Sequence, residues 1–160
     1  MRRIVILGCA GAGKSTLARR IGERIAAPVI CLDAIWRPGW GPPEVPAFRA
    51  LLEDAHAGEA WVSDGNFAQA TFDVRLPRAD LIVWLERSRW VCAARAIRRV
   101  FQPGEAHQPK DIGKVLRFIW GFNRRNRPLI EDLRARHAPM TPVRRLRSDA
   151  EIEGFLSELG

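Results

Sequence analysis

The chain has 160 residues, of which 47% are hydrophobic, and this is enough for one globular domain with a substantial core. Its formal net charge of +8 comes almost entirely from arginine, which indicates a surface that attracts nucleic acid, an anionic membrane or small polyanions, unless the arginines only reflect genomic base composition. No apolar run approaches the roughly 20 residues that span a bilayer, and the apolar start of the chain ends in a glycine loop, unlike a signal peptide. The three cysteines lack metal-site spacing. We therefore expect a cytoplasmic protein without membrane association.

Short apolar runs alternate with helical patterns along the whole chain. A strand is predicted where a few apolar, mostly β-branched residues occur together, and a helix where apolar residues recur every three or four positions. In chain order, the patterns predict strand 3–7, helix 14–26, strand 29–32, helix 46–56, strand 60–63, strand 81–85, helix 89–101, helix 112–122, helix 126–136, strand 142–146 and helix 150–159. The polar segment 102–111 contains two prolines and a glycine, so we expect a mobile loop there.

The alternation of strands and helices implies a three-layer α/β fold, in which a parallel sheet is covered on both faces. We expect a single domain over residues 1–160, with a short lid segment at about 99–125. In such sheets, ligands bind at the carboxyl ends of the strands. Gly8, Asp33 and Asp64 each stand at the end of a predicted strand, so they are expected to lie on one rim and to mark a nucleotide site.

Segment 8–15 has the pattern Gly-x-x-x-x-Gly-Lys-Ser between a predicted strand and a predicted helix, which is the phosphate-binding loop (P-loop) pattern. Its glycines allow backbone N–H groups to point inward at phosphate oxygens, and the positive end of the next helix adds to their effect. Lys14 is expected to reach the β- and γ-phosphates of ATP, Ser15 to ligate Mg²⁺ and Thr16 to donate to the α-phosphate. The predicted nucleotide-binding residues are Gly8, Gly11, Ala12, Gly13, Lys14, Ser15 and Thr16.

Two carboxylates at strand ends are candidates for chemistry. Asp64 would face the phosphate loop and hold a water of the Mg²⁺ shell, which makes it a predicted metal residue together with Ser15; alternatively it caps a turn, because Asp-Gly is common in turns. Asp33 would accept a proton from an acceptor hydroxyl or orient it, and we predict it as catalytic with Lys14. The alternative for Asp33 is an N-cap of a short helical turn over 34–36.

Tryptophan, proline and glycine dominate segment 36–43, which can be neither regular helix nor central strand. Its Trp36 and Trp40 either form a stacking surface for a planar or sugar-like acceptor or pack the loop against the core.

Arginines flank segment 102–111 on both sides: Arg95, Arg98 and Arg99 before it, and Arg124, Arg125 and Arg127 after the helix that follows it. Arginines on a closing lid stabilise the charge that develops in phosphoryl transfer, and closure excludes water. We therefore predict Arg95, Arg99 and Arg125 as catalytic residues. The alternative is a solvated or nucleic-acid-attracting face. Arg75 and Arg78 are weaker candidates for binding an acceptor phosphate.

Over nearly its whole length, the chain resembles the adenylate-kinase-related P-loop proteins that bacterial genomes label DNA topology modulation proteins. The resemblance rests on segments 8–15, 32–34, 36–40, 61–66, 75–76, 79–80, 89–90 and 123–128. It implies the P-loop NTPase fold of nucleoside monophosphate kinases, a five-stranded parallel sheet of order 2-3-1-4-5, the cofactors ATP and Mg²⁺, and phosphoryl transfer. Adenylate kinases carry Asp-Gly-Phe-Pro-Arg where residues 64–68 are Asp-Gly-Asn-Phe-Ala, so AMP is not implied as the acceptor.

Two functions follow from these features. The first is a small-molecule kinase that transfers the γ-phosphoryl group of ATP to a nucleotide, nucleoside or other hydroxyl acceptor. The alternative is a nucleic-acid-associated ATPase or ATP-binding regulator that affects DNA topology, although no nucleic-acid-reading motif is present. A nucleotide-binding protein without turnover also fits the motif. The identity of the acceptor, the oligomeric state and direct DNA binding are left open by the residues.

Overall fold

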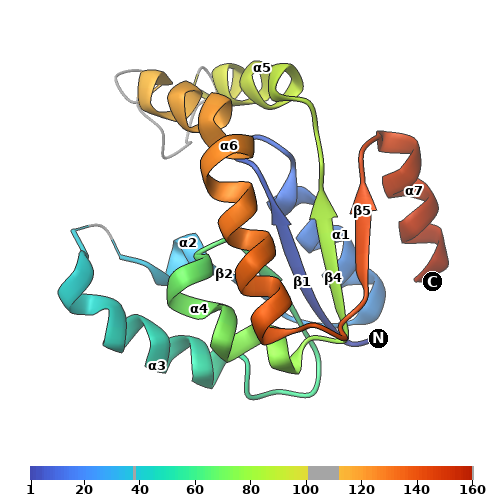
Figure 1. The fold of residues 1–160 in the computed structure, drawn as a ribbon. Coiled ribbons are helices and arrows are strands. Elements are labelled where there is room, and N and C mark those ends of the chain that lie inside the picture. The colour runs from blue at the N-terminus through green and yellow to red at the C-terminus, as the bar shows by residue number, and fades with distance from the viewer. Residues whose placement is uncertain (38, 101–111, 160) are drawn as a thin grey trace.

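The computed structural model describes residues 1–37, 39–100 and 112–159 (Figure 1). Its centre is a sheet of five parallel strands in the order β2-β3-β1-β4-β5, which confirms the predicted topology. The strands are β1 (Arg3–Gly8), β2 (Val29–Cys31), β3 (Trp61–Asp64), β4 (Leu81–Leu85) and β5 (Val143–Leu146). Every residue of β3 and β4 is buried, because a parallel sheet is covered on both faces.

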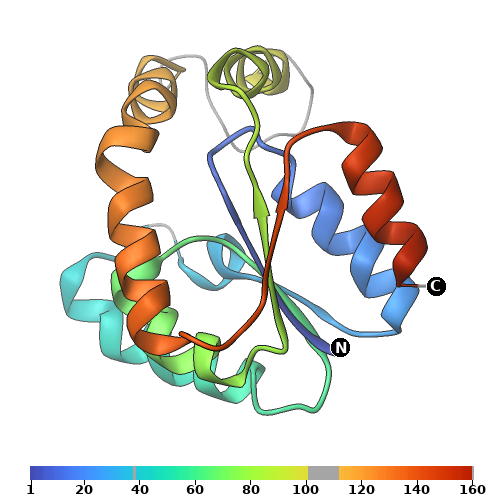
Figure 2. The same ribbon diagram turned by 45° about the vertical axis from the view of Figure 1, so that its right-hand side comes forward.

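Helices cover both faces of the sheet and complete the three predicted layers. α1 (Lys14–Ile25) and α7 (Asp149–Glu158) lie on one face, and α3 (Val45–Ala55), α4 (Ala68–Arg75) and α6 (Ile112–His137) lie on the other (Figure 2). α5 (Arg89–Val100) lies beyond the carboxyl ends of the strands (Figure 1). Within the described part of the chain, no helix is long and apolar enough to cross a membrane.

Several short helical segments occur where no regular helix was predicted. α4 and the following 3-10 turn (Leu76–Arg78) occupy a stretch without a predicted element. The buried face of α4 consists of Thr71, Phe72 and Arg75, and a face with only one apolar side chain lacks the usual amphipathic pattern. α2 (Leu32–Ile35) begins one residue before Asp33 and has Cys31 as its N-cap, so the interpretation of Asp33 as the N-cap is wrong.

α6 is one helix where two were predicted. It runs through Pro128, although proline has no N–H to donate to the carbonyl four residues earlier and normally kinks a helix. Figure 2 shows that α6 changes direction along its length. Ile119, Phe122 and Ile130 are all buried, so both halves pack on the same core, and this packing outweighs the lost hydrogen bond. The predicted loop 102–111 lies outside the described residues.

A buried polar network lies beneath β3. His56 donates from Nδ1 to the Leu52 carbonyl oxygen (2.7 Å), because a carbonyl can only accept, and its Nε2 therefore accepts from Ser63 Oγ (3.0 Å). Burial lowers the pKa of His56 to about 4, with Arg75 and Arg78 adding to the effect and the Leu52 bond opposing it. His56 is thus neutral in the folded state and holds one defined tautomer.

This burial predicts a loss of stability on acidification. The pKa of His56 falls from 6.5 to about 4 on folding, so between these values the unfolded chain binds more protons and stability decreases as the pH falls. We expect His56 to account for a loss of about 2 kcal/mol in the free energy of unfolding between pH 7 and pH 5. Urea unfolding at both pH values measures this, with His56→Gln as the comparison. An equal pH dependence in that variant would exclude His56 as its source.

Candidate functional site

The loop between β1 and α1 has the backbone that its glycines require. Gly11 and Gly13 have φ of +76° and +99°, values that side chains disfavour. A Cβ on Gly11 would also lie 2.3 Å from the Cys92 carbonyl oxygen, so α5 packs directly on the loop. Gly8 ends β1, and its N–H and C=O both bind the side-chain amide of Asn66, at 3.2 and 2.9 Å. The loop is therefore held in place from two neighbouring elements.

Replacing Gly11 with alanine is expected to lower the free energy of unfolding by about 3 kcal/mol or more, because strain at positive φ adds to a clash with backbone. Gly154 in α7 is the matched control, since a Cβ there would meet nothing within 4 Å. Gly154→Ala should stabilise the protein by about 0.5–1 kcal/mol. Urea unfolding of both variants measures the difference, and a mild effect at Gly11 would show that the loop backbone is not so constrained.

The N-terminus of α1 turns toward the loop. Its N-cap is Gly13, which provides no side-chain cap, and its first turn holds no acidic residue, so the helix dipole is not neutralised there. Lys14 Nζ donates to the Cys9 carbonyl oxygen at 3.0 Å, which places the ammonium group over the loop. Ala12 is fully buried, and it contributes backbone to the site, not a side chain.

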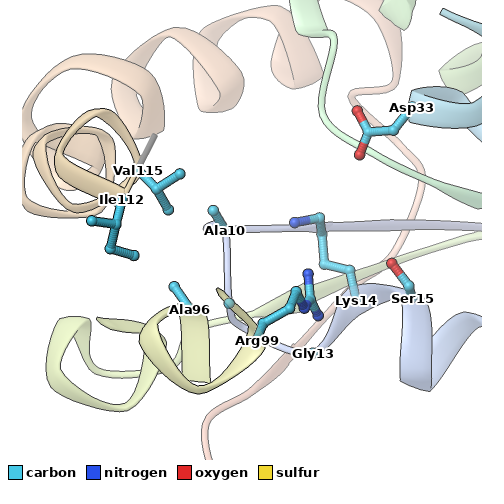
Figure 3. A pocket seen from close by; sticks show the side chains of 10 residues that line it. Ala10, Gly13, Lys14, Ser15, Asp33, Ala96, Arg99, Ile112 and Val115 are labelled. Carbon is cyan, nitrogen blue, oxygen red and sulfur yellow. The ribbon is translucent and has the colours of Figure 1, made fainter. Parts of the chain in front are cut away.

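In the part of the chain that the structure describes, three cavities adjoin this loop. The phosphate cavity, of about 150 Å³, is lined by Gly11, Lys14, Ser15 and Asp33, and by Arg99, Ile112 and Val115 from α5 and α6. Figure 3 shows the Lys14 ammonium and the Asp33 carboxylate pointing into the same space, with Ile112 and Val115 across from them. The structure therefore brings Asp33, from the end of β2, to the loop after β1. It also brings Arg99, Ile112 and Val115 of the predicted lid segment to this cavity.

The arginine cavity, of about 530 Å³, lies beside the first turns of α1. Gly11, Gly13 and Ser15 line it as they line the phosphate cavity, and Ala12 and Thr16 join them. Its arginines are Arg19, Arg20, Arg87, Arg95, Arg98 and Arg99. Arg95 also donates to the Ala12 carbonyl oxygen at 3.3 Å. The predicted pair Arg95 and Arg99 thus lies where a polyphosphate leaving the loop would be neutralised.

The third cavity, of about 400 Å³, also has Lys14 in its wall, and we call it the amide cavity after its asparagine and glutamine side chains. It shares Ala10, Lys14 and Asp33 with the phosphate cavity. Its remaining wall comes from residues 65–69 after β3 and from α6, and the polar side chains there are Asn66, Gln69 and Asn126. The three cavities therefore form a series in the order arginine, phosphate, amide, and Lys14 and Asp33 lie where the phosphate and amide cavities meet.

Asp64 is the predicted Mg²⁺ residue on β3. It is 3% exposed and lies beside Ile6 of β1 and Cys31 of β2 in the sheet. Its Oδ1 is buried and has no hydrogen-bond partner in the described structure. Such an orphaned carboxylate oxygen would suit a water of a Mg²⁺ shell to which Ser15 would add its hydroxyl, and both metal roles stay predictions. Among the described residues, no group of three His, Cys, Asp or Glu side chains that could hold a metal ion occurs.

Arg75, which was considered as a ligand of an acceptor phosphate, is a buried structural residue. It is fully buried, and its guanidinium donates to Ser63 Oγ (3.1 Å), to the Gly65 carbonyl oxygen (2.6 Å) and to the Asn66 carbonyl oxygen. Burial lowers its pKa to about 9, and nearby Asp64 opposes that shift, so it stays a cation at neutral pH. Its donors are directed at the turn after β3, and Arg75 is therefore a support for that turn and not an acceptor-phosphate ligand.

The arginines after segment 102–111 lie away from the cavities described above. Arg125 is exposed on α6 and donates to the Arg117 carbonyl oxygen at 3.4 Å, and its catalytic role stays a prediction. Arg127 forms ion pairs with Glu86 (2.6 Å) and Glu131 (3.2 Å), and the pair with Glu86 ties α6 to the end of β4.

Sequence reasoning missed the role of Asn66, which joins the end of β3 to the start of the phosphate loop. Its position directly after Asp64-Gly65, at the end of a strand next to β1, could have indicated a contact with the phosphate loop. It also left Trp36 between two interpretations. The Trp36 ring lies 5.1 Å from that of Phe48, 5.9 Å from that of Phe67 and 5.7 Å from that of Trp40. These contacts favour packing of the loop against the core.

The fold is that of P-loop kinases. A shikimate kinase of Acinetobacter baumannii in complex with shikimate matches at 17% identity over 99% of this chain and 90% of its own, with a TM-score of 0.65. A gluconokinase of Sinorhizobium meliloti 1021 matches at 19% identity over 99% and 93%, with a TM-score of 0.58. A deoxyadenosine kinase of M. mycoides with bound dCTP matches at 14% identity over 98% of each chain, with a TM-score of 0.51. No family model and no curated protein sequence matches the chain.

Proposed function

We propose that this protein is a kinase that transfers the γ-phosphoryl group of ATP to a hydroxyl group of a small molecule. The observation that carries the proposal is the series of three cavities, with Lys14 and Asp33 at the junction of the phosphate and amide cavities. A polyphosphate would run from the arginine cavity through the loop, and an acceptor would approach from the amide cavity. The folds of the three kinases described above agree with this arrangement.

The residues divide the work of the transfer between them. Backbone N–H groups of the loop, Lys14, Arg95 and Arg99 hold the phosphates and stabilise the charge that develops on the transferred group. Asp33 orients the acceptor hydroxyl and accepts its proton. At the same time the hydroxyl oxygen forms a bond to the γ-phosphorus, the bond from the γ-phosphorus to the β-phosphate oxygen breaks, and ADP is released. Ser15 and Asp64 would hold Mg²⁺, which supplies charge neutralisation of the β- and γ-oxygens when bound.

The predicted lid belongs to this proposal. α5 ends and α6 begins beside the phosphate cavity, through Arg99, Ile112 and Val115, and the Trp90 and Trp120 rings join the two helices at 5.1 Å. We assign the segment at about 99–125 to excluding water from the transferred group, which would otherwise be the acceptor. We treat residues 1–160 as a single cytoplasmic domain.

A screen of ADP formation tests the proposal. Purified protein with Mg-ATP is assayed against nucleosides, nucleotides, sugars, polyols and hydroxy acids. We expect at least one acceptor to raise ADP formation well above the rate in water alone, with a phosphorylated product detectable by mass spectrometry. Turnover that no acceptor raises above hydrolysis would reject the kinase function.

The family resemblance suggests a second function, in which the protein binds ATP and acts on DNA topology. The net charge of +8 and the exposed arginines Arg117, Arg124 and Arg125 on α6 favour it. Such binding would depend strongly on salt, because phosphate contacts release counterions. Titration of duplex DNA at low and physiological salt decides the matter, and absence of binding at low salt rejects this second function.

A further inference from the structure

The amide cavity differs in charge from the rest of the site. We propose that it receives an uncharged hydroxyl compound of the size of a sugar or nucleoside, and that it discriminates against acceptors that carry a phosphate or carboxylate group. The inference rests on the proposed kinase function and specifies its substrate class. A volume of about 400 Å³ lies within the range of small-molecule sites.

The contrast between two neighbouring cavities is the first argument. Six arginines line the arginine cavity together with two carboxylates, Asp149 and Glu153, whereas no arginine of the described chain lines the amide cavity. Its charged side chains there are Lys14 and Asp33. Lys14 also faces the phosphate cavity, where a bound polyphosphate would neutralise it, and Asp33 then leaves the amide cavity with a negative field. A second anion in that field would be repelled.

Two arginines near the cavity wall, Arg75 and Arg127, make their contacts elsewhere. Arg75 lies under the turn that forms one wall, and the Gly65 and Asn66 carbonyl oxygens accept its hydrogen bonds. On the α6 side, Arg127 is paired with Glu86 and Glu131. Although the chain has 26 lysine and arginine residues, neither Arg75 nor Arg127 is available to an acceptor in this cavity. A phosphate or carboxylate on the acceptor would lack the bidentate partner that such groups normally have in proteins.

The groups that do line the cavity suit hydroxyl groups. Gln69 and Asn126 carry amides, each of which can both donate and accept, as a hydroxyl can. Asn66 is fixed by Gly8, so its position is set before an acceptor binds. The amino end of α4 also faces the cavity through Ala68 and Gln69. This helix end offers N–H donors to hydroxyl oxygens. A helix end alone would also attract an anion, so uncharged and anionic acceptors have to be compared directly.

Phe67 gives the cavity a flat apolar wall. Its backbone is left-handed, with φ of 35° and ψ of 43°, which is rare for an aromatic residue and occurs mainly where a fold constrains it. The Phe67 ring lies 5.2 Å from the Phe48 ring, so the core holds it in this orientation. With Phe118 from α6, Phe67 provides apolar surface against which the ring of a sugar or base can pack.

Matched pairs of acceptors test the inference. Each pair differs in one charged group: sorbitol and gluconate, adenosine and AMP, and the methyl ester of shikimate and shikimate itself. Binding is measured by calorimetry in the presence of Mg²⁺ and a non-hydrolysable ATP analogue, and kcat/KM is measured with ATP. We expect the uncharged member of at least one pair to be preferred by about ten-fold or more. Preference for the anionic members, or binding of no member of any pair, would overturn the inference.

A charge variant tests whether the amide cavity is the site of this discrimination. Gln69→Arg introduces the missing cation at an exposed position of α4, and it should shift the preference toward the anionic members by about ten-fold or more. Met140→Arg adds the same charge at a residue that is 91% exposed before β5, at the opposite end of the sheet, and should leave the ratio unchanged. An equal ratio in both variants would overturn the inference.

Failure of the kinase proposal has a different signature. If the ATP analogue does not bind, or if ATP is not consumed with any acceptor that binds, the proposed function fails. If ATP is consumed with an anionic acceptor in preference to its uncharged partner, the kinase stands and only the substrate class is wrong.

Discussion

Lys14→Ala is expected to lower kcat for ADP formation by at least about 100-fold, the effect typical of removing one group that stabilises a transition state. Lys14 is the cation at the junction of the phosphate and amide cavities, so it can follow the phosphoryl group from donor to acceptor. Because its Nζ makes one hydrogen bond among the described residues, to the Cys9 carbonyl oxygen, its loss should change stability far less than activity. Steady-state kinetics and thermal unfolding of the same preparation measure the two effects.

Arg136→Ala is the matched control for this loss of one positive charge. Arg136 is 67% exposed near the end of α6, where it pairs with Asp132, and exposed pairs of this kind contribute little. Its kcat should equal that of the parent protein within about two-fold. Unchanged turnover in Lys14→Ala would remove the phosphate loop from the mechanism.

Arg75→Met is expected to lower the free energy of unfolding by about 3–5 kcal/mol, as removal of a buried ionic partner generally does. The variant removes a cation that interacts with Asp64 and leaves the Gly65 and Asn66 carbonyl oxygens without the Arg75 donor. These carbonyls belong to the turn that carries Phe67, so the wall of the amide cavity should become less ordered. Urea unfolding measures the loss of stability.

Two further variants distinguish this role from a general effect of losing charge. Arg75→Lys retains the cation but not the planar fork of donors, so its stability should lie between those of the parent and Arg75→Met. Arg78→Ala removes an arginine with one exposed hydrogen bond, to the Ala57 carbonyl oxygen, and should cost about 1 kcal/mol or less. If Arg75→Met were no less stable than Arg78→Ala, the buried network would not support the turn.

Local patterns in the sequence were sufficient to predict the strands, the phosphate loop and the position of the site. Buried strands show as apolar runs, and the glycines of segment 8–15 mark a turn that few other residues can adopt, so the strands, the phosphate loop and the rim that joins Gly8, Asp33 and Asp64 follow from residues adjacent in the chain. Such signals depend on backbone preference and spacing, which are properties of a few neighbouring residues.

Only the tertiary structure decided how the charges are distributed. Arginines look alike in a sequence, yet Arg95 and Arg99 line the phosphate side, Arg75 is buried as a support, and Arg127 is paired with Glu86. The continuation of α6 through Pro128 and the clamp of Asn66 on Gly8 likewise depend on partners distant in the chain. Burial and ion pairing arise from contacts between separate elements, and those contacts determine whether an arginine binds a ligand or holds the fold together.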